Sequence, residues 1–265
     1  MYHQEIRYQG PEGAGAPCAR FGHTATLING TKMFIFGGWN GKDYYNDLFI
    51  LDLEIMAWTK PMVSGPEPSP RQGHSAILIG SNLIVHGGFK LREDKLKKCG
   101  LAQGNVLRDS FLNDVRVLDT ESFTWSRLRI SGSPPDARYG HTLNISGQDI
   151  IMFGGWTPSS GNRGKNEGTG EHCDYFMVWS TETMTWKKGK SMGTPPSSRY
   201  GHSSTAIGPH LLIFGGWEYS KAMNEIIVLR EYGSQAGNKS VSKAGSQQSK
   251  HSLKDMGPIA EEANK

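Results

Sequence analysis

Arg20-Phe21-Gly22-His23 opens a pattern that the chain repeats four times. An apolar run follows each opening and ends in a Gly pair, and a Trp follows later in three of the copies. The openings start at Arg20, Arg71, Arg138 and Arg199, and the pairs are Gly37-Gly38, Gly87-Gly88, Gly154-Gly155 and Gly215-Gly216. Copies that recur at intervals of roughly 50 to 67 residues indicate stacked supersecondary units, each burying an apolar face against its neighbour.

Each copy predicts a small antiparallel sheet of up to four strands. Apolar second strands such as Met33-Phe34-Ile35-Phe36 are typical of strands covered on both faces. The first strands are expected over 20–28, 71–79, 138–146 and 199–207. Third strands are expected to begin near Asp47, Asp114, Asp174 and Glu225, with fourth strands at Trp58, Trp125 and Trp186. The abundant Gly and the scarcity of helix-favouring runs point the same way, to an all-β fold.

The order of these elements resembles the kelch motif, in which R-x-G-H, F-G-G, N-D-L, L-D and T-W follow one another. The resemblance covers residues 20 to about 230 and implies a kelch-type β-propeller of four-stranded antiparallel blades. The propeller domain is expected over 1–232, with blades at about 20–63, 71–130, 138–190 and 199–230. Kelch propellers usually have more blades than the four that are visible here.

Two explanations of the blade number stay open. The fourth copy has Ala236 where a Trp is expected, so its blade has three strands at most. Residues 6–10 resemble residues 128–132, which are expected to form the outermost strand of the second blade, so a strand at 2–9 could complete the last blade and close the ring. Alternatively, the chain is part of a larger propeller. Residues 233–265 lack aromatic side chains and are rich in Gly, Ser, Gln and Lys, which predicts a disordered tail.

Composition narrows the class of protein. The net charge is +4, with 29 basic and 25 acidic residues, so binding to nucleic acid or to a membrane by bulk charge is not expected. The three cysteines form no CxxC pair, which favours a reducing compartment and a cytoplasmic location, with the nucleus as an alternative. No nucleophile constellation or metal-ligand set is found, and no catalytic residue, metal or cofactor is predicted. The four Gly-His histidines are interpreted as structural.

Two sets of repeated side chains are candidates for binding a partner. The four arginines precede the innermost strands and are expected near the mouth of a central channel, where guanidinium groups grip carboxylates or pair with an adjacent blade. An aromatic follows each Gly pair and is expected to rim the same mouth or to pack between blades. The candidate residues are Arg20, Arg71, Arg138 and Arg199, with Trp39, Phe89, Trp156 and Trp217.

These residues predict a protein-interaction module or adaptor that binds a protein or peptide, acidic or carboxylate-bearing in one version, through the loop face. Insertions at 89–112 and 156–172 interrupt the second and third copies, and such departures from a repeat often carry individual function. The alternative is a propeller enzyme or a metal-dependent protein similar to the kelch specifier proteins. The fold alone does not decide between them.

Overall fold

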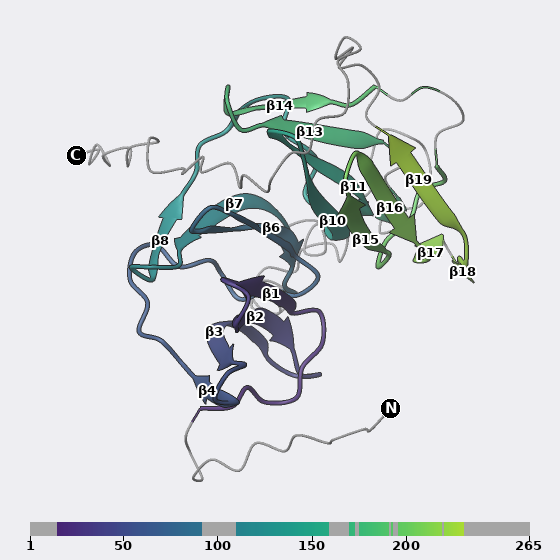
Figure 1. Ribbon diagram of the computed structural model, residues 1–265. Helices are drawn as coiled ribbons and strands as arrows, with labels where there is room; N and C mark the ends of the chain where they lie inside the picture. Colours follow the sequence, from purple (N-terminus) through teal and green to yellow (C-terminus); the bar gives the residue numbers. More distant parts are fainter. Residues whose placement is uncertain are drawn as a thin grey trace, which may run out of the picture.

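The computed structural model describes residues 15–91, 110–158, 170–172, 175–190, 192, 196–218 and 220–230. The predicted closing strand at 2–9 and the predicted tail at 233–265 lie outside these residues, as do most positions of the two insertions. Every regular element in the described part is a β-strand. Four antiparallel sheets follow one another in sequence order as the blades of a β-propeller (Figure 1), which confirms the predicted kelch-type architecture.

The first two blades have the four strands that the repeat predicts, paired in chain order. Blade one consists of β1 (Thr24–Ile28), β2 (Lys32–Trp39), β3 (Tyr44–Asp52) and β4 (Ala57–Thr59). Blade two consists of β5 (Ser75–Ile79), β6 (Asn82–Phe89), β7 (Phe111–Asp119) and β8 (Thr124–Arg127). Their innermost strands begin later than predicted, after Gly22 and Gly73, which have positive φ values of 67° and 61°.

Blades three and four depart from that plan. Blade three consists of β10 (Tyr139–Ser146), β11 (Asp149–Pro158), β13 (Phe176–Ser180) and β14 (Thr185–Lys188), and β12 (Gly170–His172) pairs with β11. Blade four consists of β15 (Ser203–Ile207), β16 (His210–Phe214) and β19 (Ile226–Arg230), with a hairpin of β17 (Trp217–Glu218) and β18 (Lys221–Ala222). In the described residues its main sheet has three strands, as expected from the missing Trp.

The linker after blade two adds a strand to the next blade. Ser131–Gly132 forms β9, which pairs in parallel with β14 of blade three. The expectation that residues 128–132 form the outer strand of blade two is therefore wrong for these two residues. Gly132 has φ 86°, and a Cβ there would overlap the carbonyl of Trp186, so only Gly allows the linker to cross so closely. Ser64 crosses blade two in the same way, by a parallel bridge to Thr124.

The apolar core lies between consecutive blades, because each strand alternates side chains between the two faces of its blade. Each blade has a front face, turned toward the next blade, and a back face, turned toward the preceding one. Three buried clusters fill the seams between blades one and two, two and three, and three and four. Phe36, Ile84 and Phe153, all 0% exposed, are among the front-face residues in these seams.

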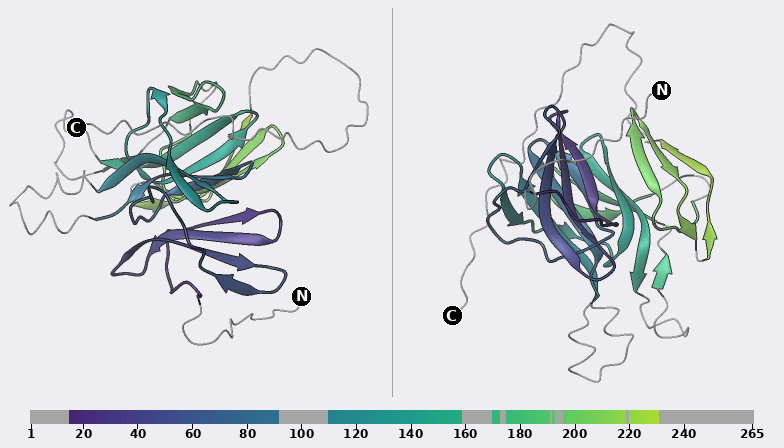
Figure 2. Two further views of the ribbon diagram at one scale, coloured as in Figure 1. Left: turned by 90° about the vertical axis from the view of Figure 1, so that its left-hand side faces the viewer. Right: turned by 90° about the horizontal axis from the view of Figure 1, so that it is seen from below.

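Backbone hydrogen bonds near the centre fix the spacing of the blades. The Gly of each R-x-G-H segment donates its N–H to the carbonyl of the Gly in the preceding blade, at 2.7–2.8 Å, through Gly73 to Gly22, Gly140 to Gly73 and Gly201 to Gly140. A second set runs from the second Gly of each pair to the Arg carbonyl of the next blade, as from Gly155 to Arg199 at 2.8 Å. The views in Figure 2 show the blades in succession, with blades one and four at the two ends.

Candidate functional site

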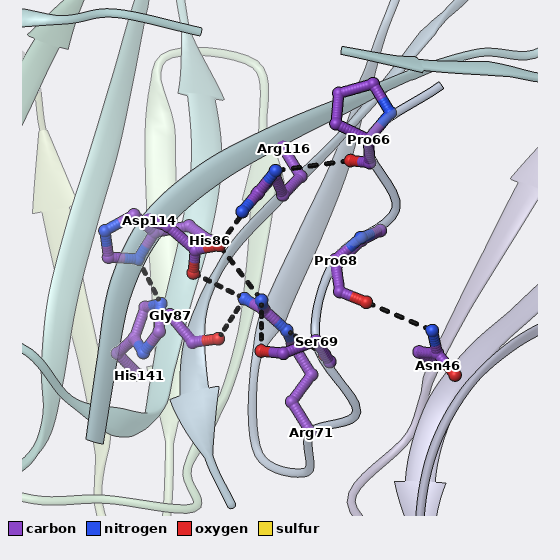
Figure 3. Close-up of polar contacts among 10 residues, drawn as sticks. All are labelled: Asn46, Pro66, Pro68, Ser69, Arg71, His86, Gly87, Asp114, Arg116 and His141. Carbon is purple, nitrogen blue, oxygen red and sulfur yellow. Dashed lines mark hydrogen bonds and ion pairs between the residues drawn. The ribbon is translucent and has the colours of Figure 1, made fainter. Parts of the chain in front are cut away.

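The four repeated arginines are held inside their own blades. Each guanidinium donates to the carbonyl of the first Gly of its pair, at distances of 3.0, 2.9, 3.0 and 3.2 Å for Arg20, Arg71, Arg138 and Arg199. Arg71 also pairs with both carboxylate oxygens of Asp114, at 2.8 and 3.0 Å (Figure 3). Arg20 pairs with both carboxylate oxygens of Asp47 in the same way, and Arg199 pairs with Oε1 of Glu225. Arg138 donates instead to the Tyr175 hydroxyl at 2.6 Å.

This placement differs from the expected alternative in which each arginine pairs with an adjacent blade. Arg71, Arg138 and Arg199 are 0% exposed, and their pairs link strands of one blade rather than adjacent blades. Burial alone would raise the pKa of Asp114, but hydrogen bonds and charge from Arg71, with a further contribution from Arg116, lower it to about 2. The arginines thus join the Gly pair to the third strand, and contact with a partner by them stays a prediction.

Three of the Gly-His histidines lie in the seams between blades. Nε2 of His74 lies 3.0 Å from Oγ1 of Thr24 in the preceding blade, and Nε2 of His202 lies 2.9 Å from Oγ1 of Thr142. His141 meets Nδ1 of His86 at 3.0 Å instead, because blade two has His where the other blades have Phe before the Gly pair. Burial lowers the pKa of His74 and His86 to about 3, so both are neutral at neutral pH.

The predicted aromatics belong to a larger set of rings that crosses all four blades. This set, the aromatic belt, consists of Phe21, Trp39, Tyr44, Phe89, Phe111, Tyr139, Trp156, Tyr200 and Trp217. Centroids of successive rings from Phe21 to Tyr200 lie 5.2 to 6.3 Å apart. Trp217 joins the belt by its backbone bridge to Tyr200. All four predicted aromatics are therefore brought together.

The repeat itself positions the belt. In each blade the residue between Arg and Gly of R-x-G-H pairs with the aromatic after the Gly pair, as Phe21 does with Trp39 through two backbone hydrogen bonds of 2.9 Å. Tyr139 and Tyr200 occupy this position in blades three and four, whereas blade two has Gln72 there. Phe21, Tyr139 and Tyr200 were not among the residues predicted to bind a partner. An aromatic at that position in three of the four copies was the available signal.

The belt is most open at its two ends. Phe21 is 55% exposed and Trp217 is 47% exposed, whereas Phe111 is 8% exposed in the middle. Burial, and then the neighbouring Tyr200, raise the pKa of Tyr139 to about 12, so the ring stays neutral at physiological pH. Aromatic faces of this kind bind apolar side chains and cations, and Trp and Tyr are enriched at binding hot spots.

Two further kinds of group bear on the function: metal ligands and membrane-spanning helices. No cluster of three or more His, Cys, Asp or Glu side chains with metal-binding geometry occurs among the residues that the structure describes. Within the same residues there is no helix of the length and apolarity needed to cross a bilayer.

Known proteins share the repeat. A family model described as the KLHDC2/KLHL20/DRC7 Kelch-repeats domain matches residues 4–155 and 103–250. Kelch domain-containing protein 3 of Bos taurus is 31% identical over 202 residues, or 76% of this chain and 48% of that protein. Host cell factor of Drosophila melanogaster is 30% identical over 250 residues, or 84% of this chain and 15% of that protein. The chain thus spans about half the length of the first relative and less of the second. With most of its length matched, the chain belongs to the kelch-repeat family.

Proposed function

We propose that the chain is a protein-interaction module that binds a peptide or loop of a partner protein across the aromatic belt. The observation that carries this proposal is the continuity of the belt over four blades, with exposed rings at both ends. A rigid sheet edge that presents Trp, Tyr and Phe offers large contact area at low entropic cost. Kelch-repeat relatives fit an interaction module of this kind.

A more specific form of the proposal is that the bound peptide or loop is acidic. The Arg199 guanidinium is fully buried, but its partner Glu225 has a side chain that is 50% exposed. A partner carboxylate would have to replace Glu225 to reach the arginine. Binding through such an exchange would weaken as salt is added, because dissolved ions screen the attraction between the partner's carboxylates and the positive charge of the chain. Binding through the aromatic belt alone would depend little on salt.

The test uses peptides selected from a displayed random library on the full chain. Affinities of the selected peptides are then measured for the double variant Phe21→Ala, Trp217→Ala, which truncates the two open ends of the belt. We expect roughly ten-fold weaker binding or more, because exposed aromatic anchors at interfaces are typical hot spots. A salt series on the same peptides separates the acidic version from the apolar one.

The matched control is the double variant Ile55→Ala, Met62→Ala. These side chains are 73% and 92% exposed and lie away from the belt, so they test the loss of exposed apolar area in general. The control is expected to bind like the unmodified chain. Equal affinity of the belt variant and the unmodified chain, with both folded by circular dichroism, would overturn the proposal. Selection of no peptide at all would overturn it as well.

A further inference from the structure

We propose that the front face of blade four binds the back face of blade one in a second copy of this chain, head to tail. The proposal concerns faces of whole blades rather than the aromatic belt. It rests on the three seams inside the chain, which repeat one set of contacts. The front face of blade four has the residues of one side of such a seam, and the back face of blade one has the residues of the other side.

The front face of blade four is apolar and uncovered. Phe214 is 52% exposed, whereas Phe36 and Phe153 at the equivalent positions are 0% exposed. Ile226 pairs with Phe214 in the sheet and is 64% exposed, whereas the equivalent Phe176 is 8% exposed. Val228 and Ile207 extend the same face at 53% and 59% exposure. Contiguous apolar surface of this kind marks an interaction site.

The back face of blade one is open along its innermost strand. His23 is exposed, whereas His74, His141 and His202 at the equivalent positions are 5%, 4% and 7% exposed. Ala25 is also exposed, although its equivalent in blade three, Leu143, belongs to the core of a seam at 7% exposure. Along this strand blade one therefore presents positions that the later blades bury, whereas Ile35 and Phe49, farther out on the same face, are 5% and 6% exposed.

The polar groups of the two faces match as well. Inside the chain, the seam hydrogen bonds join Gly N–H to Gly C=O, the second Gly of the pair to Arg C=O, and Arg N–H to a third-strand C=O such as that of Tyr45. At the new seam, Gly22 and Arg20 of one copy would meet Gly201, Gly216 and Met223 of the other. His23 would meet Ser203, which occupies the position that Thr24 and Thr142 have in the existing His contacts.

A second copy is the occupant that these contacts select. Both halves of the seam lie on this chain, and a Cβ on Gly201 would have no described atom within 4 Å, whereas on Gly140 it would meet Gly201 and Tyr200 of the next blade. Because the two faces differ, the contact is heterologous and gives either a closed ring of copies or a longer head-to-tail assembly. Both outcomes use the same seam.

The test is sedimentation of the full chain over a range of concentrations, with reductant present because Cys18 is exposed. The expected result is a mass of two copies or more that increases with concentration. Val228→Asp on the front face of blade four and Ala25→Asp on the back face of blade one are each expected to weaken association roughly ten-fold or more, because a charge is buried without a partner. Ile55→Asp, at a 73% exposed turn position, is the control.

Mixing the two variants gives the decisive result. The Val228→Asp chain keeps an intact blade-one face and the Ala25→Asp chain keeps an intact blade-four face, so the mixture is expected to form pairs that neither variant forms alone. A variant that fails to fold could not restore association in this way. A monomer at every concentration, as closure of the ring within one chain would give, overturns the proposal. Association that survives both substitutions, or that the mixture does not restore, overturns it too.

Discussion

The front faces of blades three and four carry side chains of the same kind in the same register. Phe153 pairs with Phe176 in blade three, and Phe214 pairs with Ile226 in blade four. In blade three the R-x-G-H segment of the next blade covers this pair, and His202 lies edge-on to the Phe153 ring at 5.3 Å. In blade four the same positions are half exposed or more. The comparison teaches that the apolar second and third strands of the repeat serve the neighbouring blade as much as their own.

The largest expected difference between the front faces of blades three and four is the loss of stability when the Phe ring before the Gly pair is removed. Phe153→Ala deletes a fully buried side chain that stacks on Phe176 at a centroid distance of 4.6 Å. We expect it to lower the free energy of unfolding by about 3–5 kcal/mol. Phe214→Ala removes a side chain that is 52% exposed, and about 1 kcal/mol or less is expected. Urea denaturation of dilute protein measures both values, and equal losses would contradict the comparison.

A smaller difference is expected at the Gly pairs. Gly154 and Gly215 both have φ 68°, so Ala strains the backbone equally at each. At Gly154 the added Cβ would also approach the Arg199 carbonyl to 2.5 Å and His202 to 2.6 Å, whereas at Gly215 its nearest contact is the Met223 carbonyl at 3.3 Å. Gly154→Ala should therefore cost about 2–3 kcal/mol and Gly215→Ala about 1 kcal/mol. Thermal unfolding of the two variants tests this, and the reverse order would be inconsistent with a covered blade three.

The last expected effect is the dependence of stability on pH, which is spread over a range of pH values. Burial, and then the charge of Arg199, lower the pKa of His202 to about 4, whereas in the unfolded chain the pKa is about 6.5. The unfolded chain therefore binds the extra proton as the pH falls from about 6.5 to about 4, and stability decreases by up to about 1.4 kcal/mol per pH unit from this residue. Below about pH 4 the contribution becomes constant.

Two Gln variants assign that dependence to the covered seam. In His202→Gln, the unfolding free energy should fall less between about pH 6.5 and about pH 4, because the buried group no longer titrates. In His23→Gln, which alters the exposed equivalent on blade one, the pH profile should stay closer to that of the unmodified chain. Denaturant titrations at several pH values give the profiles. An unchanged profile for His202→Gln would be at odds with its depressed pKa.

The contacts inside each blade could be predicted from the sequence. The Gly pairs, the apolar second strands and the spacing to Trp125 and Trp186 follow from strand periodicity and from the exact repeat of the turns. The three strands that the described residues form in the main sheet of the last copy were likewise expected from Ala236. Such features depend on residues that are near one another in the sequence, and the same pattern in several copies strengthens the prediction for each copy.

Contacts between blades were harder to predict, because they depend on how the sheets stack. Three contacts join different copies of the repeat. His74 contacts Thr24, His141 contacts His86 in place of a Thr, and β9 pairs with β14 of blade three. The pairing of the arginines was left open for a related reason. Their residue type suits both a carboxylate ligand and an internal Asp, and only the third-strand positions of Asp114 and its equivalents favour the internal pair.

The linker crossings make the blades depend on one another during local unfolding. Ser131 donates its N–H to the Met184 carbonyl at 3.0 Å, and Trp125 donates its N–H to the Ser64 carbonyl at 2.8 Å. An outer strand can therefore detach only when the linker of the preceding blade also comes away. Amide hydrogens of β8 and β14 should exchange through openings that involve two blades at once, so these outer strands exchange as slowly as strands nearer the axis. Contacts between the linkers and the outer strands thus couple the unfolding of neighbouring blades, in addition to the apolar seams.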